Sequence, residues 1–330
     1  MSSLLENFAY ARPTSFEQLN DIIAECQKNN SHFAFSAGGT NLIPRLKTQS
    51  LKIDKMISLK GLQGLNVIKK QDDRIIIGAL TSLNDVVTSA LIQEYLPALA
   101  AAAHKVASPQ IRNCATIGGN IMVDNRCIYI DQSSLNRKCH DPCFKADGDV
   151  CHLVKSVKKG DDILCQARFV SDTAPVLLLL SAKITIVGPH GCRKIDLSDL
   201  YLKDGISSRN LQAGEIITQL DVPIIKDCHI YYEKLAIRNA LDFPSLGVAV
   251  KLTNGDLSVA LTGLNTHPGI FMGKLADYEN FDEMRADICA QAMRFAKSYQ
   301  QDFFPRAYRK SMIPVFITRG IAAIQKGDRQ

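Results

Sequence analysis

The chain has 330 residues, of which 46% are hydrophobic and 22% are charged, a composition typical of globular proteins. This length exceeds what one typical core accommodates, so two or three domains are expected. The 39 basic and 33 acidic residues give a net charge of +6 and are scattered along the chain, which argues against a nucleic-acid-binding role.

Neither targeting nor membrane segments are evident. The opening MSSLLENFAYARPTS lacks the basic and apolar regions of a signal peptide. The longest apolar run, residues 174–182, is far shorter than the ~20 residues that span a bilayer. We therefore expect a cytoplasmic, reducing environment without a membrane span, in which clustered cysteines more often bind metal than form disulfides.

The first two thirds of the chain predict a mixture of helices and strands. Residues 12–27 have apolar side chains at helical spacing, and Ser15 and Gln18 form a capping-box pattern at the start. A short strand at residues 32–36 follows and leads into a Gly-Gly turn. Further strands are predicted at 74–80, 182–188 and 215–223, and helices at 82–95 and 96–107.

The pattern changes from Tyr231 onward. Residues 246–252 and 257–264 alternate apolar and polar side chains around Asn254-Gly255-Asp256, which predicts an antiparallel hairpin. Helices follow at 281–299 and 306–325, the second broken or kinked by Pro314. We expect a domain boundary near residues 222–227.

Half of the ten cysteines lie in one polar segment, residues 126–165. Four thiolates from such a loop suit a [4Fe–4S] cluster, because soft sulfur ligands stabilise iron in that form. A Cys₄ or Cys₃His zinc site is an alternative, since His140 and His152 sit beside cysteines, and a loop without metal is also compatible with the spacing. The five cysteines are Cys127, Cys139, Cys143, Cys151 and Cys165.

Two Gly-Gly turns share one pattern, AGGTNL at residues 37–42 and TIGGNI at residues 116–121. Glycines let main-chain N–H groups approach an anion, and consecutive N–H groups form a nest for phosphate oxygens. Two such loops could hold one pyrophosphate, although each could also be an ordinary tight turn. Neither loop fits a Rossmann fingerprint or a P-loop.

Seven stretches in order resemble the flavin-binding subunit of the molybdenum hydroxylases, the family of xanthine dehydrogenase and carbon monoxide dehydrogenase. The stretches are FAYARPTSFEQL, AGGTNLIP, SPQIRNCATIGGNI, SDTAPVLLLLSAKITIVG, LQAGEIITQLDVP, YYEKLAIRNALDFPSLGVAV and RAYRKSMIPVFITRGI. The resemblance implies an α+β fold, with a two-part FAD-binding domain of the vanillyl-alcohol-oxidase type at residues 1–56 and 57–224. Residues 225–330 would form a C-terminal domain with a small antiparallel sheet and helices.

The same resemblance implies FAD as cofactor and assigns its site. Asp172 corresponds to an acidic residue near the adenosine ribose, Ile217 to an aliphatic residue near adenine, and Lys234 to a basic residue close to the flavin, with the segment 238–243 bordering the ring. From the residues alone, Asp172 could equally cap the helix that follows. The loop residues implied are Ser36, Ala37, Gly38, Gly39, Thr40, Asn41 and Leu42, with Ala107, Thr116, Gly119 and Asn120.

Residues 123–167 form an insertion that most family members lack. It resembles the insertion of the 4-hydroxybenzoyl-CoA reductase β-subunit, which holds an extra [4Fe–4S] cluster. The implied ligands are Cys127, Cys143, Cys151 and Cys165, and the first two spacings, 16 and 8 residues, match that pattern. Residues 156–162 lengthen the loop before Cys165, which leaves Cys139 open as the fourth ligand.

The resemblance implies an electron-transfer subunit of a larger molybdenum enzyme. Its partners would be a large molybdopterin subunit, a small [2Fe–2S] subunit and a soluble electron donor or acceptor. Aromatic acyl-CoA reduction and hydroxylation of an aldehyde or N-heterocycle, as in xanthine and aldehyde dehydrogenases, are both open reactions for the complex. The sequence is also compatible with a self-sufficient flavin oxidoreductase that has a redox-sensing or zinc-stabilised loop. A further alternative is a non-catalytic scaffold that binds a nucleotide and a structural zinc.

Overall fold

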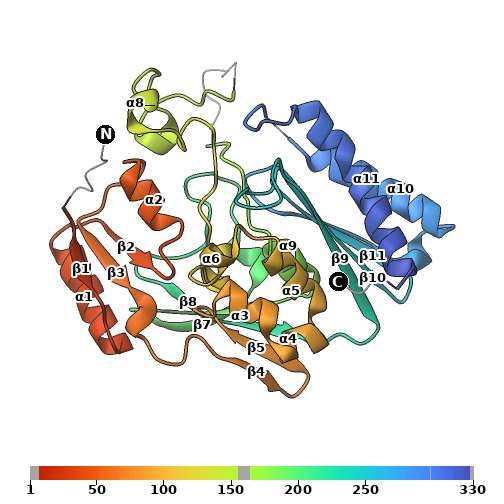
Figure 1. Cartoon of the computed structure of the whole chain (residues 1–330), viewed down its shortest axis with the longest axis horizontal. Helices are drawn as coiled ribbons and strands as arrows, with labels where there is room; N and C mark the ends of the chain where they lie inside the picture. Colours follow the sequence, from red (N-terminus) through yellow and green to blue (C-terminus); the bar gives the residue numbers. More distant parts are fainter. Residues whose placement is uncertain (1–6, 155–163, 298, 328–330) are drawn as a thin grey trace.

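The computed structural model describes residues 7–154, 164–297 and 299–327 and contains three sheets (Figure 1). The first sheet is parallel, in the order β1-β3-β2, and packs with α1. Leu19 and Ile23 of α1 are buried in one cluster with Ile57 of β3, as the helical spacing predicts. The elements of this part are β1 (Ala9–Ala11), α1 (Phe16–Lys28), β2 (Phe33–Ser36), α2 (Leu42–Lys47) and β3 (Lys55–Ser58).

The predicted capping box of α1 forms in modified form. Ser15 Oγ accepts a hydrogen bond from Gln18 N at 3.2 Å, as expected for the N-cap. Gln18 Oε1, however, accepts from the main chain of Thr14 at 2.9 Å, one residue earlier than a capping box requires. Both hydrogen bonds still fix the start of the helix.

The second sheet is antiparallel throughout, in the order β4-β5-β8-β6-β7, and its apolar face forms the main core with the helices α3, α5, α7 and α9. The predicted strands at 74–80, 182–188 and 215–223 correspond to β5, β6 and β8. The five strands are β4 (Ile68–Gln71), β5 (Arg74–Gly78), β6 (Lys183–Gly188), β7 (Gly191–Asp196) and β8 (Ile216–Pro223).

The two helices predicted at 82–95 and 96–107 are three shorter ones. Ser89 leaves the helical conformation because its hydroxyl caps the next helix, accepting from Ile92 N at 3.4 Å. Leu96 ends that helix because a residue before proline disfavours helical geometry. The short helices of this part are α3 (Leu83–Thr88), α4 (Ala90–Tyr95), α5 (Pro97–His104), α6 (Pro109–Arg112), α7 (Ile117–Ile121) and α9 (Ala174–Leu179).

The third sheet, in the order β12-β11-β10-β9, is antiparallel and has helices on both faces. Val248 and Val250 of β10 face the helices α10 and α11, whereas Ala249 faces the main core. The buried part of the strand, residues 246–250, therefore carries no polar side chain instead of alternating as expected. The predicted hairpin is confirmed: Thr253 pairs with Asp256 across a two-residue turn. The elements are β9 (Cys228–Leu235), β10 (Leu246–Thr253), β11 (Asp256–Thr262), β12 (Gly269–Gly273), α10 (Phe281–Phe295) and α11 (Arg306–Gln325).

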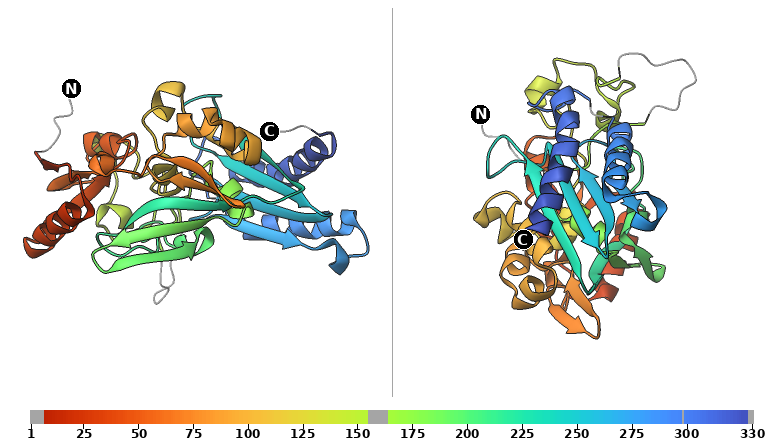
Figure 2. Two further views of the ribbon diagram at one scale, coloured as in Figure 1. Left: turned by 90° about the horizontal axis from the view of Figure 1, so that it is seen from below. Right: turned by 90° about the vertical axis from the view of Figure 1, so that its right-hand side faces the viewer.

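The helix α11 has the predicted bounds and continues through Pro314. Figure 2 (left) shows the first sheet at one end of the molecule and α10 and α11 at the other. The described part of the insertion rises from the middle of the molecule and carries α8 (Ser134–Arg137), which lies beside α2 in Figure 1. Arg137 ties it there, donating to Thr48 O at 2.8 Å and Gln49 O at 2.9 Å.

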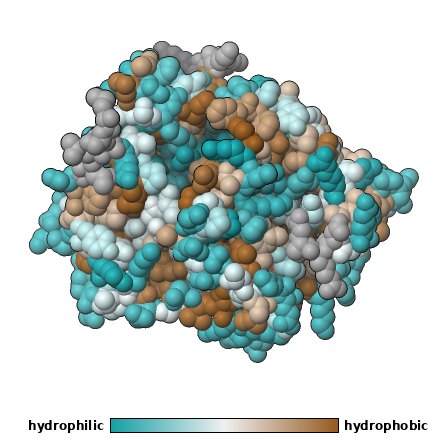
Figure 3. Space-filling model, in the orientation of Figure 1, coloured by the Kyte–Doolittle hydropathy of each residue, from teal (hydrophilic) through white to brown (hydrophobic). Residues whose placement is uncertain are grey.

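No helix in the described ranges is both long and apolar enough to cross a bilayer. Hydrophilic and apolar residues are interspersed over the face shown in Figure 3. The residues expected to lengthen the cysteine loop, 156–162, lie outside the part of the chain that the structure describes.

Packing of α11 against the third sheet predicts the effect of core truncation. Ile317 is fully buried, whereas Val315 in the same helix is exposed. We expect Ile317→Ala to lower the free energy of unfolding by about 2–5 kcal/mol, and Val315→Ala to change it by less than about 0.5 kcal/mol. Denaturant unfolding of the two variants tests this difference, and equal losses would contradict the assignment of the core face.

Candidate flavin and cysteine sites

A cavity of about 520 Å³ is lined by residues from all three parts of the chain, a size within the range of cofactor pockets. Thirteen of the fourteen residues expected at FAD line it. Lys234 does not, but it bonds to Asp172, which does. The thirteen are Ser36, Ala37, Gly38, Gly39, Thr40, Asn41, Leu42, Ala107, Thr116, Gly119, Asn120, Asp172 and Ile217.

The first Gly-Gly loop leaves β2 and turns directly into α2. Gly39 has φ +72°, a conformation that favours glycine. A Cβ at Gly38 would stand 2.0 Å from the main-chain oxygen of Cys114, so this loop lies against the segment before the second loop. Asn41 Nδ2 is buried without a hydrogen-bond partner among the described residues, and it is therefore a donor left over for a bound group.

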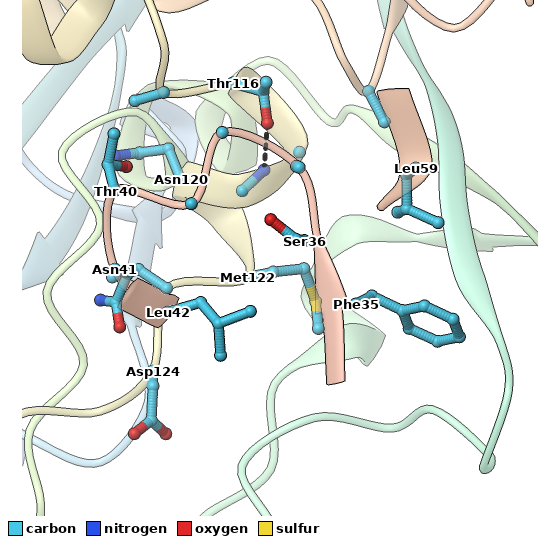
Figure 4. A pocket seen from close by; sticks show the side chains of 18 of the residues that line it. Phe35, Ser36, Thr40, Asn41, Leu42, Leu59, Thr116, Asn120, Met122 and Asp124 are labelled. Atoms are coloured by element: carbon cyan, nitrogen blue, oxygen red, sulfur yellow. Dashed lines mark hydrogen bonds between the residues drawn. The ribbon is translucent and has the colours of Figure 1, made fainter. Parts of the chain in front are cut away.

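The polar side chains of the second loop form hydrogen bonds within the protein. Thr116 Oγ1 accepts from Gly119 N at 3.0 Å and so caps α7, as the dashed line in Figure 4 shows. Asn120 Oδ1 accepts from the hydroxyls of Ser171 and Thr173, both at 2.7 Å. These oxygens hold the loop to the start of α9, and Figure 4 shows both loops bordering the same space.

Two non-glycine residues of the cavity wall have left-handed backbones. Ala107 has φ +45° and Leu241 has φ +65°. Such conformations cost of the order of 1–3 kcal/mol each and concentrate at binding sites, where the surrounding structure maintains them. Asp242 holds the loop of Leu241 through an ion pair with Arg238, which also donates its main-chain N–H to this carboxylate at 2.7 Å.

Asp172 lies in a buried polar network behind the cavity. Ser171 Oγ, rather than Asp172, accepts from Ala174 N at 3.1 Å, so the alternative that Asp172 caps α9 is wrong. Its carboxylate accepts instead from Tyr232 Oη at 2.8 Å and Lys234 Nζ at 3.1 Å. Burial raises the pKa of Asp172, and the Lys234 ammonium and the Tyr232 hydroxyl act in the opposite direction.

Lys234 is fixed by three acceptors. Besides Asp172, its ammonium donates to the main-chain oxygens of Lys105 at 2.9 Å and Asp242 at 2.8 Å. All three ammonium donors are therefore used within the protein. Lys234 consequently joins the loop that carries Leu241 to the end of α5, and both segments continue into the cavity wall.

Sequence reasoning missed several residues of the cavity. They come from β2, α2, the segment after α7, the residue after β3 and the residue before β8. Adjacency to a Gly-Gly loop could have indicated the first three groups, whereas no pattern indicated Leu59 and Glu215. The apolar and charged ones are Phe35, Arg45, Leu59, Met122, Asp124 and Glu215.

A second, small cavity is lined by four cysteines, which are those implied as cluster ligands: Cys127, Cys143, Cys151 and Cys165. Cys139 does not line it and is exposed. None of these cysteines is in a disulfide. His152 and Lys145 also line the cavity, and His152 Nε2 lies 2.8 Å from the main-chain oxygen of Asp141.

A tight turn brings Cys143 and Cys151 together. The main-chain oxygen of Cys143 accepts from Ala146 N at 2.7 Å and Gly148 N at 3.0 Å, and Phe144 N donates to Val150 O at 2.9 Å. A Cβ at Gly148 would stand 1.8 Å from Pro142 O, so glycine is required at that close approach. The eight-residue spacing is thus spanned by one compact loop.

Acidic side chains hold the main chain of the other two cysteines, of which Cys127 is partly buried and Cys165 buried. Cys127 N donates to Asp131 at 2.9 Å, and Cys165 N donates to Asp204 at 3.0 Å. Burial raises the pKa of the Cys127 thiol to about 12 and that of the Cys165 thiol to about 11. A bound metal centre would supply the positive charge that turns such thiols into thiolates.

The two cavities share one stretch of chain. Residues 122–124 line the large cavity and Cys127 lines the small one. Asn125 anchors this stretch, because its amide donates to Ala167 O at 3.0 Å and Thr266 O at 2.7 Å. Arg126 stacks at 4.6 Å on Phe243, which lines the large cavity.

Comparison with known proteins identifies the family. Residues 6–225 match the FAD-binding domain of molybdopterin dehydrogenases. The chain belongs to this family. It is 34% identical over 263 residues to the carbon monoxide dehydrogenase medium chain of Hydrogenophaga pseudoflava, covering 78% of this chain and 75% of that protein. It is 25% identical over 255 residues to the xanthine dehydrogenase FAD-binding subunit of Escherichia coli O157:H7, covering 76% and 70%.

Solved structures share the fold across the whole chain. Reconstituted carbon monoxide dehydrogenase from Oligotropha carboxidovorans aligns with a TM-score of 0.74 at 21% identity, over 97% of this chain and 98% of that chain. Quinoline 2-oxidoreductase from Pseudomonas putida 86 aligns with a TM-score of 0.72 at 17% identity, over 99% and 100%. The α+β fold expected for a flavin-binding subunit of the molybdenum hydroxylases is confirmed.

The donors of the large cavity fit the FAD that this family binds. Gly38 and Gly39 expose main chain, Asn41 offers a buried unpaired amide, and the walls around them are mainly apolar. An anionic pyrophosphate needs such donors, and a flat ring system needs such walls.

The close approach of Gly38 to the main chain of Cys114 predicts that a side chain at position 38 weakens FAD binding. We expect Gly38→Ala to weaken FAD affinity at least ~10-fold, because a Cβ 2.0 Å from Cys114 O must separate the two loops. The control is Gly64→Ala, at φ +77° and not among the residues that line the cavity, which costs about 1 kcal/mol of stability through backbone strain. Fluorescence titration with FAD distinguishes them, and equal affinities would contradict this role of Gly38.

The Asp172–Lys234 pair predicts non-additive effects on stability. Lys234→Met leaves a buried carboxylate uncompensated, so we expect a loss of about 3–5 kcal/mol in unfolding free energy. Adding Asp172→Asn removes that charge and should restore at least about 2 kcal/mol. Denaturant unfolding of the single and double variants measures this. A double variant no more stable than Lys234→Met would contradict the ion pair.

Proposed function

We propose that this chain is the FAD- and [4Fe–4S]-containing electron-transfer subunit of a multi-subunit molybdenum hydroxylase-type oxidoreductase. One observation carries the proposal. Four cysteines line a single cavity, and the stretch 122–127 joins its wall to that of the large cavity, which we call the flavin cavity. Bound FAD would exchange two electrons with a soluble partner, and an iron–sulfur centre would carry one electron at a time.

The residues that would hold FAD follow from the cavity wall. Main-chain groups of the first Gly-Gly loop and the Asn41 amide would bind the pyrophosphate, with the second loop closing the opposite side. Asp172 would bind the adenosine ribose and Ile217 would contact adenine, as in the family pattern. Lys234 would act through Asp172 and through the loop that carries Phe243.

The cysteine cavity supports an iron–sulfur cluster by the chemistry of its donors. Cys127, Cys143, Cys151 and Cys165 supply four soft sulfur ligands, whereas the exposed Cys139 lies outside the cavity. In the described ranges, no group of three or more His, Cys, Asp or Glu side chains is already arranged to hold a single metal ion. The proposal therefore rests on the four cysteines that line one cavity.

A zinc-stabilised loop is the second candidate for this cavity. His152 lines it together with the cysteines, so a Cys₃His set is chemically available. In that case the chain would be a flavoprotein in which the insertion has a structural role only.

The complex would contain a large molybdopterin subunit and a small [2Fe–2S] subunit. Relatives with similar sequences bear names such as medium chain and FAD-binding subunit, which supports a hetero-oligomer. The cysteine insertion favours aromatic acyl-CoA reduction of the 4-hydroxybenzoyl-CoA reductase kind. Relatives named glyceraldehyde dehydrogenase and xanthine dehydrogenase keep an aldehyde or N-heterocycle as the alternative substrate.

Metal analysis after anaerobic reconstitution with iron and sulfide tests the cluster. We expect about four irons per chain in the wild-type protein and in Cys139→Ser, and loss of iron in Cys151→Ser and Cys165→Ser. Cys139→Ser is the matched control because its thiol is exposed and lies outside the cavity. Bound zinc without iron would support the structural-zinc candidate, and iron loss in Cys139→Ser alone would overturn the proposed ligand set.

A further inference from the structure

We infer that Lys145 is a charge-positioning residue shared by the two cavities: its ammonium neutralises Asp124 in the flavin cavity, and the residue also lines the cavity of the four cysteines. This inference rests on the proposed cluster, and it concerns a residue outside both sets of expected ligands. Lys145 lies in a 3₁₀ turn, Phe144–Ala146, directly after Cys143.

The position of the Lys145 charge is fixed by three hydrogen bonds. Its ammonium donates to Asp124 Oδ1 at 2.8 Å, to Asn125 O at 2.8 Å and to Gly205 O at 2.9 Å. Its side chain is only 7% exposed. With all three donors used and little water contact, the charge stays in place and is weakly screened by salt.

On one side, Lys145 reaches the cysteine cavity, which it lines. Gly205, one of its acceptors, donates its own N–H to Cys165 O at 2.8 Å. A Cβ at Gly205 would stand 2.8 Å from Cys165 Sγ, so the Lys145 acceptor lies immediately beside this thiol. The same ammonium therefore supports the main chain that positions one proposed ligand.

On the other side, Lys145 acts on the flavin cavity through Asp124. The Asp124 carboxylate lines that cavity and accepts from Lys145 and, at 2.9 Å, from Arg45 of α2. Arg45 belongs to the first part of the chain, Asp124 to the stretch after α7 and Lys145 to the insertion. The three charges consequently join the parts that build the two cavities.

Other cations near the cysteines are engaged elsewhere and do not line their cavity. Arg126 pairs with Asp131 at 3.1 Å and stacks on Phe243. Arg137 donates to main-chain oxygens of residues 48, 49 and 132. The anionic groups that face the site are Asp131 and Asp204, each bonded to the main-chain N–H of a cysteine. Arg168 pairs with Asp302 at 2.8 Å. Among the lysines and arginines that the structure describes, Lys145 is thus the one that lines the cysteine cavity and could balance thiolates there.

A fixed positive charge favours the electron-richer state of a nearby centre. Removing the Lys145 charge should shift the cluster's midpoint potential to more negative values, and removing the Asp124 charge should shift it the opposite way. Loss of Lys145 also leaves Asp124 with Arg45 alone, so the flavin cavity becomes more negative. FAD, an anion, should then bind ~10-fold more weakly, because its repulsion by the Asp124 carboxylate is no longer offset by Lys145.

The experiment compares full-length reconstituted wild-type protein with the variants Lys145→Met, Lys145→Arg, Asp124→Asn and Lys138→Met. Lys138 is the matched control, an exposed lysine of the same insertion. Iron and sulfide content, the midpoint potential followed by electron paramagnetic resonance, and FAD affinity are measured for each. We expect a negative potential shift and weaker FAD binding in Lys145→Met, near-wild-type values in Lys145→Arg and Lys138→Met, and a positive shift in Asp124→Asn.

Opposite shifts from the two charge removals cannot arise from a general loosening of the loop. The inference would be overturned if Lys145→Met and Lys138→Met had the same midpoint potential. It would also be overturned if the two variants had the same FAD affinity. If Lys145→Met fails to hold iron, its potential is not measurable and the Asp124→Asn variant becomes the test. An unchanged or more negative midpoint potential in Asp124→Asn would then overturn the inference. Absence of iron in the wild-type protein would remove the proposed cluster, and this inference with it, before any variant is compared.

Discussion

The approach of Gly38 to the main chain of Cys114 is the contact on which both cavities depend. It sets the first Gly-Gly loop against the segment that leads into the second, and the space between them is the flavin cavity. The second loop continues through α7 into residues 122–127, which form a wall of that cavity and end at the first cysteine of the other. A change in the distance between the loops therefore affects both sites.

Several polar side chains fix this arrangement through hydrogen bonds within the protein rather than through contacts with a cofactor. Asn120 joins the second loop to the start of α9, and Asn125 joins the following stretch to the third sheet. Buried polar groups that are fully bonded in this way specify one arrangement of segments distant in sequence. The donors left for a cofactor are accordingly few, main-chain groups of the first loop and the Asn41 amide among them.

Much of the fold could be predicted because local patterns determine it. Apolar spacing placed α1, and Asn254-Gly255 placed the hairpin of β10 and β11. The break between α3 and α4 was not predicted, because it depends on the Ser89 cap, which competes with continuation of the helix. The strand β7 was not predicted because it is mainly polar. The network of Asp172, Tyr232 and Lys234 joins residues 60 or more apart, a pairing that no spacing rule indicates.

An iron–sulfur cluster and FAD are proposed to occupy neighbouring cavities of one chain. A crystal structure of the anaerobically prepared protein, measured on both sides of the iron absorption edge, would show both groups at once. We expect anomalous iron density bounded by Cys127, Cys143, Cys151 and Cys165, with FAD between the two Gly-Gly loops. Zinc density there, or no metal density beside bound FAD, would contradict this proposal.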